Sequence, residues 1–217
     1  MAEVRAQRAS TPGEPVEIFL ASRNAKKLGE MERILAEHLP GATVVGLDDV
    51  PAYDEPVEDG PTFEGNALLK ARAGFAVTGL PSVADDSGLC VDALNGMPGV
   101  LSARWSGPPK SDERNNRLLL DQLVDVPDER RTAHFRCAVA FVHAGGELVV
   151  HGRMDGHVIR EVRGSGGFGY DVLFVADDHP GVTTAELSRE DKDAISHRGK
   201  ALRELAPLLA RQLGSAG

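Results

Sequence analysis

The sequence predicts an α/β protein with a mixed β-sheet, and two patterns carry this prediction. Near the N-terminus, a short apolar run at 16–21 is followed by apolar residues at helical spacing, which is typical of a parallel βα unit. In the middle of the chain, apolar residues recur at every second position from 133 to 141, and a turn signal at 144–147 follows. Parallel and antiparallel pairings together indicate a mixed sheet flanked by helices.

The first half of the chain is expected to hold two strands, two helices and a long acidic loop. The apolar residues from Leu28 to Leu39 recur at helical spacing until Pro40-Gly41 interrupts them, and Thr62 has the N-cap position of a second helix. In chain order we expect a strand at 16–21, a helix capped by Ser22 or Asn24, a strand at 42–46, a loop at 47–62 and a helix at 63–77. The loop is too long for a simple turn, which suggests that it has a function.

The second half is expected to add a hairpin and three helices. In chain order we expect an apolar strand at 82–84 that leads into Asp85-Asp86-Ser87-Gly88, an extended run at 89–91, an irregular segment at 96–109, a helix capped by Ser111, hairpin strands at 133–141 and 148–159, a short apolar segment at 172–175, and helices that begin at Ser188 and Ser196. The glycines between 164 and 169 predict an irregular loop after the hairpin.

The composition restricts the class of protein. The chain has 217 residues, of which 41% are hydrophobic and 26% are charged, as in a globular protein. Its net charge of −9 argues against a protein that grips long DNA or RNA, because that function needs a basic surface. Cys90 and Cys137 lie in apolar runs and are expected to be reduced core thiols. With a polar leader at 1–14 and no apolar run of membrane-spanning length, we expect a cytoplasmic protein with one domain over 15–217.

Basic residues gather at the start of the first expected helix, in the segment Ser22-Arg23-Asn24-Ala25-Lys26-Lys27. Cations are unfavourable beside the positive end of a helix dipole unless an anion binds there. The segment therefore suggests a phosphate site, although it lacks the pattern of a Walker A loop. A solvated basic helix start would have the same sequence, so both interpretations stay open.

Acidic residues occur at two places that suit a divalent cation. Glu58-Asp59-Gly60 precedes the helix that carries Asn66 and Lys70, and Asp85-Asp86 follows an apolar strand. Magnesium prefers few carboxylates together with substrate phosphates, and one acid of a pair can also accept a proton. Ordinary helix capping by acids and a tight Asx turn are the alternative interpretations of these two places.

Two further segments suit a purine base. The loop 164–169 matches GxGxxG, but an extended run is expected after it instead of a helix, so we reject a dinucleotide-binding fold. Its glycines would let the Phe168 and Tyr170 rings approach a flat base, although a flexible turn is the alternative. Lys192 and the pair His197-Arg198 can donate hydrogen bonds to a carbonyl oxygen or a phosphate. Together, the phosphate, metal and base features favour a nucleoside triphosphate site with metal-assisted hydrolysis.

The chain resembles the inosine triphosphate pyrophosphatase family in five stretches that occur in the family's order: SRNAKKLGEM, EDGPTFEGNALLKA, ADDSGLCVDALNGMPGVLSARWSG, GGFGYDVLF and AELSREDKDAISHRGKAL. The resemblance implies an elongated fold of two lobes around the mixed sheet, with the active-site cleft between the lobes. It also implies a homodimer, Mg²⁺ as cofactor, and hydrolysis of ITP, dITP or XTP to the monophosphate and pyrophosphate. Such an enzyme removes non-standard purine nucleotides from the nucleotide pool, and cleaves between the α- and β-phosphates.

The resemblance further implies roles for individual residues. Asp86 corresponds to the family's proton acceptor and magnesium ligand, and Glu58 is the expected second metal ligand. The expected substrate contacts are Ser22, Arg23, Asn24, Ala25, Lys26, Lys27, Lys70, Ser87, Phe168, Gly169, Tyr170, Asp171, Lys192, His197 and Arg198. Donors such as the His197 backbone or the Arg198 guanidinium favour the 6-carbonyl of inosine and xanthine over the 6-amine of adenine.

Two departures from the family's pattern and three alternatives stay open. Arg23 stands where the family commonly has glycine, and Val57 stands where it often has a further acid before Glu58. Because a metal-bound carboxylate is a poor base, Asp86 either accepts a proton or mainly positions the metal. The chain could instead prefer methylated or pyrimidine nucleotides, or bind a nucleotide without turnover. Guanine shares the 6-carbonyl and adds a 2-amino group, so its rejection needs a further contact.

Overall fold

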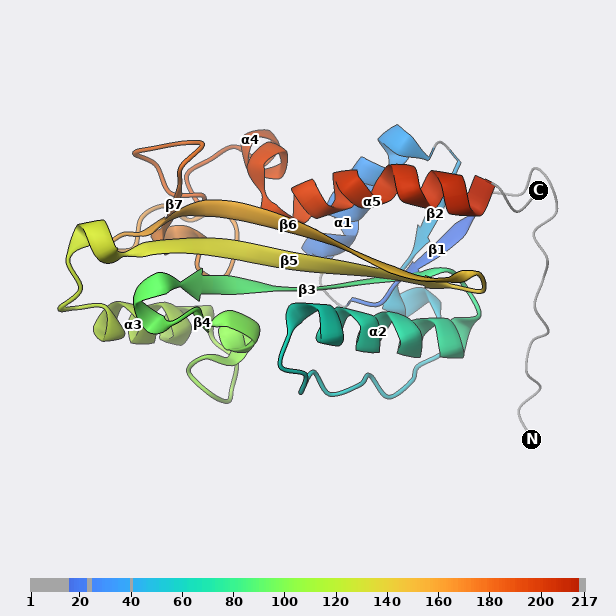
Figure 1. Ribbon diagram of the computed structural model, residues 1–217, viewed down its shortest axis with the longest axis horizontal. Coiled ribbons are helices and arrows are strands. Elements are labelled where there is room, and N and C mark those ends of the chain that lie inside the picture. Colours follow the sequence, from blue (N-terminus) through green and yellow to red (C-terminus); the bar gives the residue numbers. More distant parts are fainter. Residues whose placement is uncertain (1–15, 23–24, 40, 215–217) are drawn as a thin grey trace. The chain divides into compact units, whose positions relative to one another are not determined.

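The structure is a computed structural model that describes residues 16–22, 25–39 and 41–214 (Figure 1). The expected leader at 1–14 lies outside these residues, as do Arg23 and Asn24. Helices and strands are interspersed along the chain, so the predicted α/β class is confirmed. None of the described helices is both long enough and apolar enough to cross a membrane.

The helices and strands closely follow the expected order. They are β1 Glu17–Leu20, α1 Ala25–His38, β2 Thr43–Val45, α2 Phe63–Thr78, β3 Ser82–Val91, β4 Met97–Pro98, α3 Asp112–Gln122, β5 Thr132–His143, β6 Gly146–Val158, β7 Phe174–Ala176, α4 Arg189–Ile195 and α5 His197–Gly214. The predicted N-caps Thr62 and Ser111 each accept a hydrogen bond from a backbone amide of the first helical turn. Ser188, predicted as a helix start, is the N-cap of α4 in the same way.

The described strands form one mixed sheet in the order β2-β1-β3-β5-β6-β7, with β4 paired to β3. β1 pairs in parallel with both β2 and β3, whereas β6 and β7 are antiparallel. The predicted mixture of parallel and antiparallel pairs is therefore confirmed. In the register of β1 and β3, Phe19 lies opposite Ser82 and Leu20 opposite Val83, so that β3 continues beyond this pairing into Asp85 and Asp86.

The chain divides into two compact units, each built from separated segments. The first unit comprises the described residues up to Asp86, the hairpin tip Ala138–Val150 and the C-terminal helix from Ala201 onward. The second comprises Ser87–Cys137 and His151–Lys200. Passing along β3, the chain leaves the first unit at Asp86 and enters the second at Ser87.

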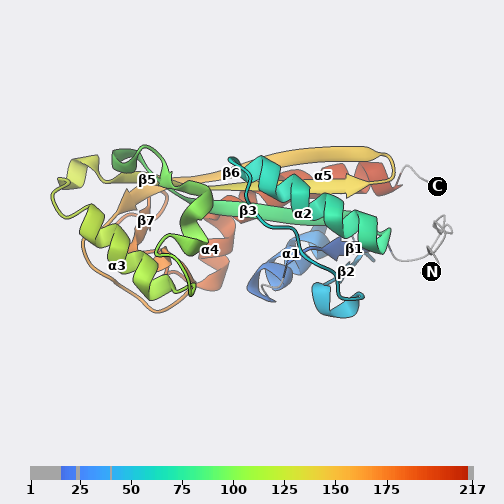
Figure 2. The ribbon, with the colours of Figure 1, turned by 90° about the horizontal axis from the view of Figure 1, so that it is seen from below.

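In the first unit, helices cover both faces of the strands. α2 lies on one face and α5 on the other, as two perpendicular views show (Figures 1 and 2). Gly74 lets α2 approach β1 closely, because a Cβ atom there would lie 2.7 Å from the Phe19 ring. Close packing of this kind leaves a helix little freedom to shift, so α2 is a firm support for the polar side chains on it.

The second unit has a hydrophobic core of its own. Its buried members are Leu89, Val91, Leu119, Leu123, Ala133, Phe135, Met154, Val158, Tyr170, Leu173, Phe174 and Ala176. Beside this core, the buried Arg131 guanidinium donates to the carbonyls of Leu123, Val158 and Ile159 at 2.7, 2.8 and 2.9 Å. These bonds join the end of α3 to the start of β5 and the end of β6.

Two local predictions are wrong. The segment Asp85-Asp86-Ser87-Gly88 does not follow the end of a strand, because β3 runs through it without interruption from Ser82 to Val91. The segment expected to be extended after the glycine loop begins with a 3-10 turn at Asp171–Leu173, and the strand starts only at Phe174. The glycine loop is thus followed by one short turn and a strand, which agrees with the rejection of a dinucleotide-binding fold.

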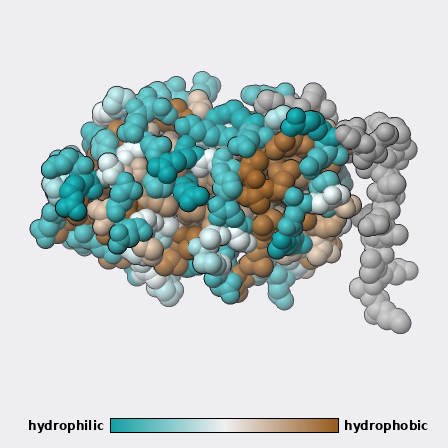
Figure 3. All heavy atoms as spheres, viewed as in Figure 1, coloured by the Kyte–Doolittle hydropathy of each residue, from teal (hydrophilic) through white to brown (hydrophobic). Residues whose placement is uncertain are grey.

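The surface and the cysteines agree with the composition. Hydrophilic side chains cover most of the face seen in Figure 3, and a hydrophobic area lies on the side of α5. Cys90 and Cys137 are both buried thiols, as predicted.

Candidate active site

Strand β3 places two acids in the interior. Asp85 and Asp86 are only 5% and 7% exposed. Successive side chains of a strand point to opposite faces, so the two carboxylates meet different partners. Because a buried carboxylate is costly without cations or hydrogen-bond donors, each acid has to be matched by residues from elsewhere in the fold.

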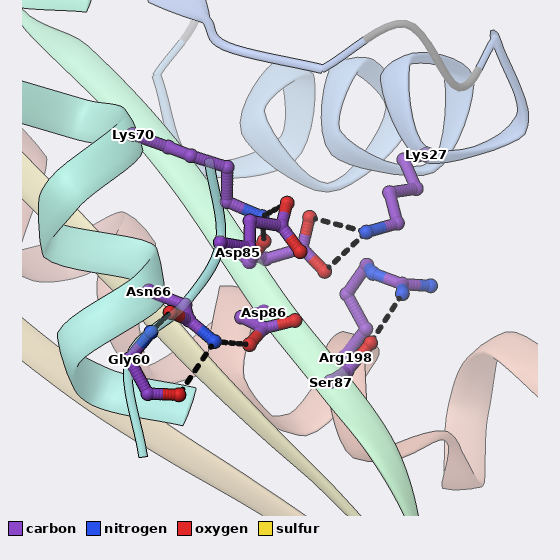
Figure 4. A network of polar contacts seen from close by, with 9 residues as sticks. Lys27, Gly60, Asn66, Lys70, Asp85, Asp86, Ser87 and Arg198 are labelled. Atoms are coloured by element: carbon purple, nitrogen blue, oxygen red, sulfur yellow. Dashed lines mark hydrogen bonds and ion pairs between the residues drawn. The ribbon is translucent and has the colours of Figure 1, made fainter. Parts of the chain in front are cut away.

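Lys27 from the first turn of α1 pairs with Asp85. Its Nζ donates to the two carboxylate oxygens at 2.9 and 2.8 Å (Figure 4). Of the predicted phosphate segment, the structure thus brings Lys27 to the acids of β3, while Ser22 lies just after the end of β1. Ala25 and Lys26 are the first two residues of α1. Arg23 and Asn24 lie outside the described residues.

Lys70 from α2 links Glu58 to β3. Its Nζ donates to the Glu58 carboxylate at 2.7 Å and to the Asp85 carbonyl at 2.6 Å. Burial lowers the pKa of Lys70, but the charges of Asp85 and Glu58 outweigh this effect and hold the pKa above its ordinary value. The ammonium group is therefore a permanent cation at the acidic loop, able to exchange a carboxylate for a phosphate oxygen.

Asn66 holds Asp86, a role that the sequence reasoning did not assign. Its Nδ2 donates to Asp86 Oδ2 at 2.9 Å, and its Oδ1 accepts from the Gly60 amide at 2.9 Å (Figure 4). A Cβ atom on Gly60 would lie 2.6 Å from Asn66 Oδ1, so a side chain there would push the Asn66 amide away from this contact. The available signal was a polar residue one helical turn before Lys70, on the same side of α2.

The environment of Asp86 raises its pKa above the ordinary value. Burial is the main cause, and the charges of Glu58 and Asp85 add to it, whereas Lys70 and the hydrogen bond from Asn66 act in the opposite direction. A raised pKa makes a carboxylate a better proton acceptor, and a bound cation would relieve the repulsion among the acids.

The donor set fits a magnesium ion that also binds substrate. Among the described residues there is no group of three or more histidine, cysteine or acidic side chains arranged to hold a metal. Asp86 and Glu58 offer carboxylate oxygens, the ligand type that magnesium prefers, and phosphate oxygens would complete its coordination. The residues therefore fit a metal that arrives with the nucleotide better than a metal held by protein alone.

In the second unit, Asp171 organises the glycine loop. It accepts hydrogen bonds from the Phe168 amide at 2.8 Å and from Thr184 Oγ1 at 2.9 Å, and it forms an ion pair with Lys192. Gly167 has a positive φ of 70°, and a Cβ atom there would lie 2.1 Å from the Asp171 carboxylate. The loop therefore takes its shape from Asp171 together with a glycine that no other residue could replace without strain.

Phe168 offers an aromatic face next to two cations. Its side chain is 40% exposed, with Lys192 Nζ 5.1 Å and the Arg198 guanidinium carbon 5.9 Å from the ring centroid. Arg198 is itself buried and donates to Ser87 Oγ at 3.1 Å (Figure 4). An exposed ring with donors beside it suits a flat heterocycle that carries carbonyl oxygens.

The two remaining ring residues of the predicted site face inward. The His197 ring stacks on Phe135, with centroids 4.9 Å apart. The Tyr170 ring lies in the core, where its hydroxyl donates to the Ser102 carbonyl at 3.0 Å and burial raises its pKa. The structure therefore places Phe168, Ser87, Lys192 and Arg198 in one group, and leaves the substrate contacts of Tyr170 and His197 as predictions.

The sequence model of the Ham1 family matches residues 18–208, which is most of the chain. This chain belongs to the Ham1 family. The resemblance inferred from five sequence stretches is thus confirmed, and those stretches include the acids, lysines and glycine loop of this Ham1 protein.

This Ham1 chain is similar over most of its length to proteins of about the same size. The dITP/XTP pyrophosphatase of Nocardia farcinica is 62% identical over 195 residues, which is 89% of this chain and 94% of the relative. The one of Mycolicibacterium paratuberculosis is 60% identical over 193 residues, 88% of this chain and 95% of the relative.

Solved structures of two similar proteins share the fold. The dITP/XTP pyrophosphatase of Mycobacterium abscessus is 55% identical with a TM-score of 0.73 and coverage of 89% and 100%. The Staphylococcus aureus Ham1 protein is 37% identical with a TM-score of 0.81 and coverage of 90% and 99%.

Proposed function

We propose that this chain hydrolyses non-standard purine nucleoside triphosphates (dITP, ITP and XTP) to the monophosphate and pyrophosphate. Relatives that bear the name dITP/XTP pyrophosphatase and match nearly their whole length support this function. The structural observation that carries it is the buried acid Asp86, which Asn66 holds by a 2.9 Å hydrogen bond beside the cation Lys70.

The first unit would act on the phosphates. Lys27 and Lys70 now neutralise Asp85 and Glu58, and a triphosphate would offer the same ammonium groups oxygens of higher charge. Magnesium, held by Asp86 and Glu58 together with the phosphates, would neutralise charge that builds up on the phosphoryl oxygens. Asn66 would keep one oxygen of Asp86 in place, so that the carboxylate faces the reacting phosphate in a single orientation.

The second unit would recognise the base. Phe168 would stack on the purine, and Lys192 and Arg198 would donate to the 6-carbonyl that dITP and XTP share. Adenine carries an amine at that position, which would leave these donors unpaired, and such a mismatch is worth several orders of magnitude in kcat/KM.

Three further properties are part of the proposal. We propose Mg²⁺ as the cofactor, a homodimer as the assembly and the cytoplasm as the location, where the free nucleotide pool is found. Light scattering after gel filtration is expected to give twice the chain mass of 23.1 kDa. A single-chain mass would contradict the dimer.

Product analysis tests the function. The chain is incubated with Mg²⁺ and, separately, dITP, XTP, GTP, dATP, a pyrimidine triphosphate and a methylated nucleotide, and pyrophosphate is separated from orthophosphate. We expect pyrophosphate and the monophosphate from dITP and XTP, with little turnover of the others and none in EDTA. A higher kcat/KM for the pyrimidine or methylated nucleotide would contradict the substrate class. Calorimetric binding of dITP without product would contradict catalysis.

A further inference from the structure

Helix α3 holds the glycine loop by both backbone groups of a single residue. The amide of Gly169 donates to Asp112 Oδ2 at 2.7 Å, and its carbonyl accepts from Asn116 Nδ2 at 2.9 Å. Asp112 and Asn116 are four residues apart, so their side chains share one side of the helix. Gly169 has a positive φ of 61°, a conformation that side chains disfavour, and it directly follows Phe168.

Asn116 carries an unsatisfied acceptor. The residue is 6% exposed, and no atom of the described residues forms a hydrogen bond with its buried Oδ1. An unpaired polar atom in the interior costs stability, and an apolar residue of similar shape would avoid that cost. The Oδ1 atom therefore gives no reason for an asparagine at this position. The hydrogen bond that Nδ2 donates to the Gly169 carbonyl gives one.

Packing does not hold the loop on this side. Asp112 and Asn116 line a hollow of about 510 Å³ that is also lined by Leu120, Phe168 and Val172. Where side chains do not fill the space beside a loop, its position depends on its hydrogen bonds. Phe168 is then fixed by two successive amides: its own amide donates to Asp171, and the next donates to Asp112.

We propose that Asp112 and Asn116 are positioning residues that set the place of the Phe168 ring beside Lys192 and Arg198, and thereby the discrimination between 6-oxo and 6-amino purines. This inference rests on the proposed function. Neither residue is expected to touch the reacting phosphates, because both act through Gly169. Their loss should therefore weaken base binding and selectivity while it leaves the chemical step largely intact.

The test compares Asp112→Ala and Asn116→Leu with two controls in the full-length protein. Asp112→Asn keeps an oxygen that can accept from the Gly169 amide, and Glu113→Ala removes the neighbouring exposed acid of the same helix. For dITP we expect the two test variants to raise KM about 3- to 10-fold with kcat within about 2-fold. We also expect the ratio of kcat/KM for dITP over dATP to fall. Asp112→Asn should recover most of the loss, and Glu113→Ala should match the wild type.

Two further measurements separate positioning from general destabilisation. Asn116→Leu removes the unsatisfied oxygen, so its melting temperature should be no lower than that of the wild type. Hydrogen exchange of the Gly169 amide should be faster in Asp112→Ala. Unchanged KM and selectivity in an active enzyme would overturn this inference alone, as would equal losses in Asp112→Asn and Asp112→Ala. A wild type that does not turn over dITP would overturn the proposed function as well.

Discussion

Burial raises the pKa of Asp86, the cation Lys70 lowers it, and the effect of burial prevails. The carboxyl lies in the interior next to two other acids, and the donors Lys70 and Asn66 only partly compensate. In the folded, metal-free protein the ionised form is therefore disfavoured. The same feature that makes Asp86 a better proton acceptor makes it a cost to stability.

Asp86→Asn should therefore stabilise the metal-free protein at neutral pH. In the unfolded chain Asp86 has an ordinary pKa of 3.8, and in the folded chain its pKa is higher. Stability of the wild type thus falls as pH rises from the ordinary value to the raised one, and this loss is complete above the raised value. Asparagine does not ionise, and its amide oxygen still accepts from Asn66. Thermal melts in EDTA should show a higher melting temperature for the variant at neutral pH, and no difference near about pH 4. A lower melting temperature at neutral pH would contradict this account.

Asn66 should affect both the stability of the protein and the pKa of Asp86. Asn66→Ala leaves the Gly60 amide and the Asp86 carboxylate without their partner, which should cost about 1–3 kcal/mol in urea unfolding. Loss of the donor should also raise the pKa of Asp86 further and move the acidic limb of the activity profile to higher pH. A cost below about 0.5 kcal/mol, with an unchanged pH profile, would show that the contact is incidental.

At the scale of elements, prediction succeeded where periodicity or capping is local. The helix that begins after Thr62 and the hairpin between β5 and β6 are examples, since a cap and alternating apolar residues depend on near neighbours. β3 was predicted only as two separate extended runs, at 82–84 and 89–91, because Asp85-Asp86-Ser87-Gly88 interrupts its apolar pattern. Burial of these residues depends on partners far along the chain, such as Lys27, Asn66 and Arg198, and no local pattern reveals them.

The residues of the candidate site likewise include some that the sequence predicted and some that it did not. Its lysines and Asp86 were assigned through the resemblance, because they stand in contiguous stretches. The holding residues Asn66, Asp112 and Asn116 were not, since a polar residue on a helix gives no sign of which distant backbone group it will meet. The sequence assigned no partner to Asp85, and in the structure it pairs with Lys27.

Arg131 should contribute more to the stability of the second unit than any other single side chain. Its guanidinium donates to three carbonyls that lie at the end of α3 and at and just beyond the end of β6. Arg131→Met leaves these buried carbonyls without a charged donor, so we expect a loss of about 3 kcal/mol in denaturant unfolding. Arg130→Met, at the exposed neighbouring position, should stay within about 0.5 kcal/mol of the wild type. Equal effects of the two variants would contradict the role of Arg131.

At the scale of the whole molecule, the net charge is negative, and the lysines of the candidate site are paired with nearby acids. The chain carries a charge of −9, while Lys27 and Lys70 sit among acids that hold them in place. Such a distribution suits a small polyanion that can compete for two lysines. It does not suit a long one, which needs an extended basic surface. The two compact units are each assembled from separated segments, so no boundary could be read from the linear sequence.

Nucleic acid should therefore not bind. Fluorescence anisotropy of a labelled DNA duplex is expected to stay unchanged on addition of the protein at about 0.15 M salt. The same preparation should turn over dITP, which serves as the control for folded protein. Saturable binding of the duplex under these conditions would contradict the charge argument.

The account depends most on Asp86, and one measurement tests it directly. Initial rates of pyrophosphate release from dITP with Mg²⁺ are compared for the wild type and Asp86→Asn, and the melting temperatures of the same two preparations are recorded in EDTA without nucleotide. We expect the rate to fall at least about 100-fold while the melting temperature does not fall. A variant that retains most of the wild-type rate, or a wild type that releases orthophosphate first, would contradict the account.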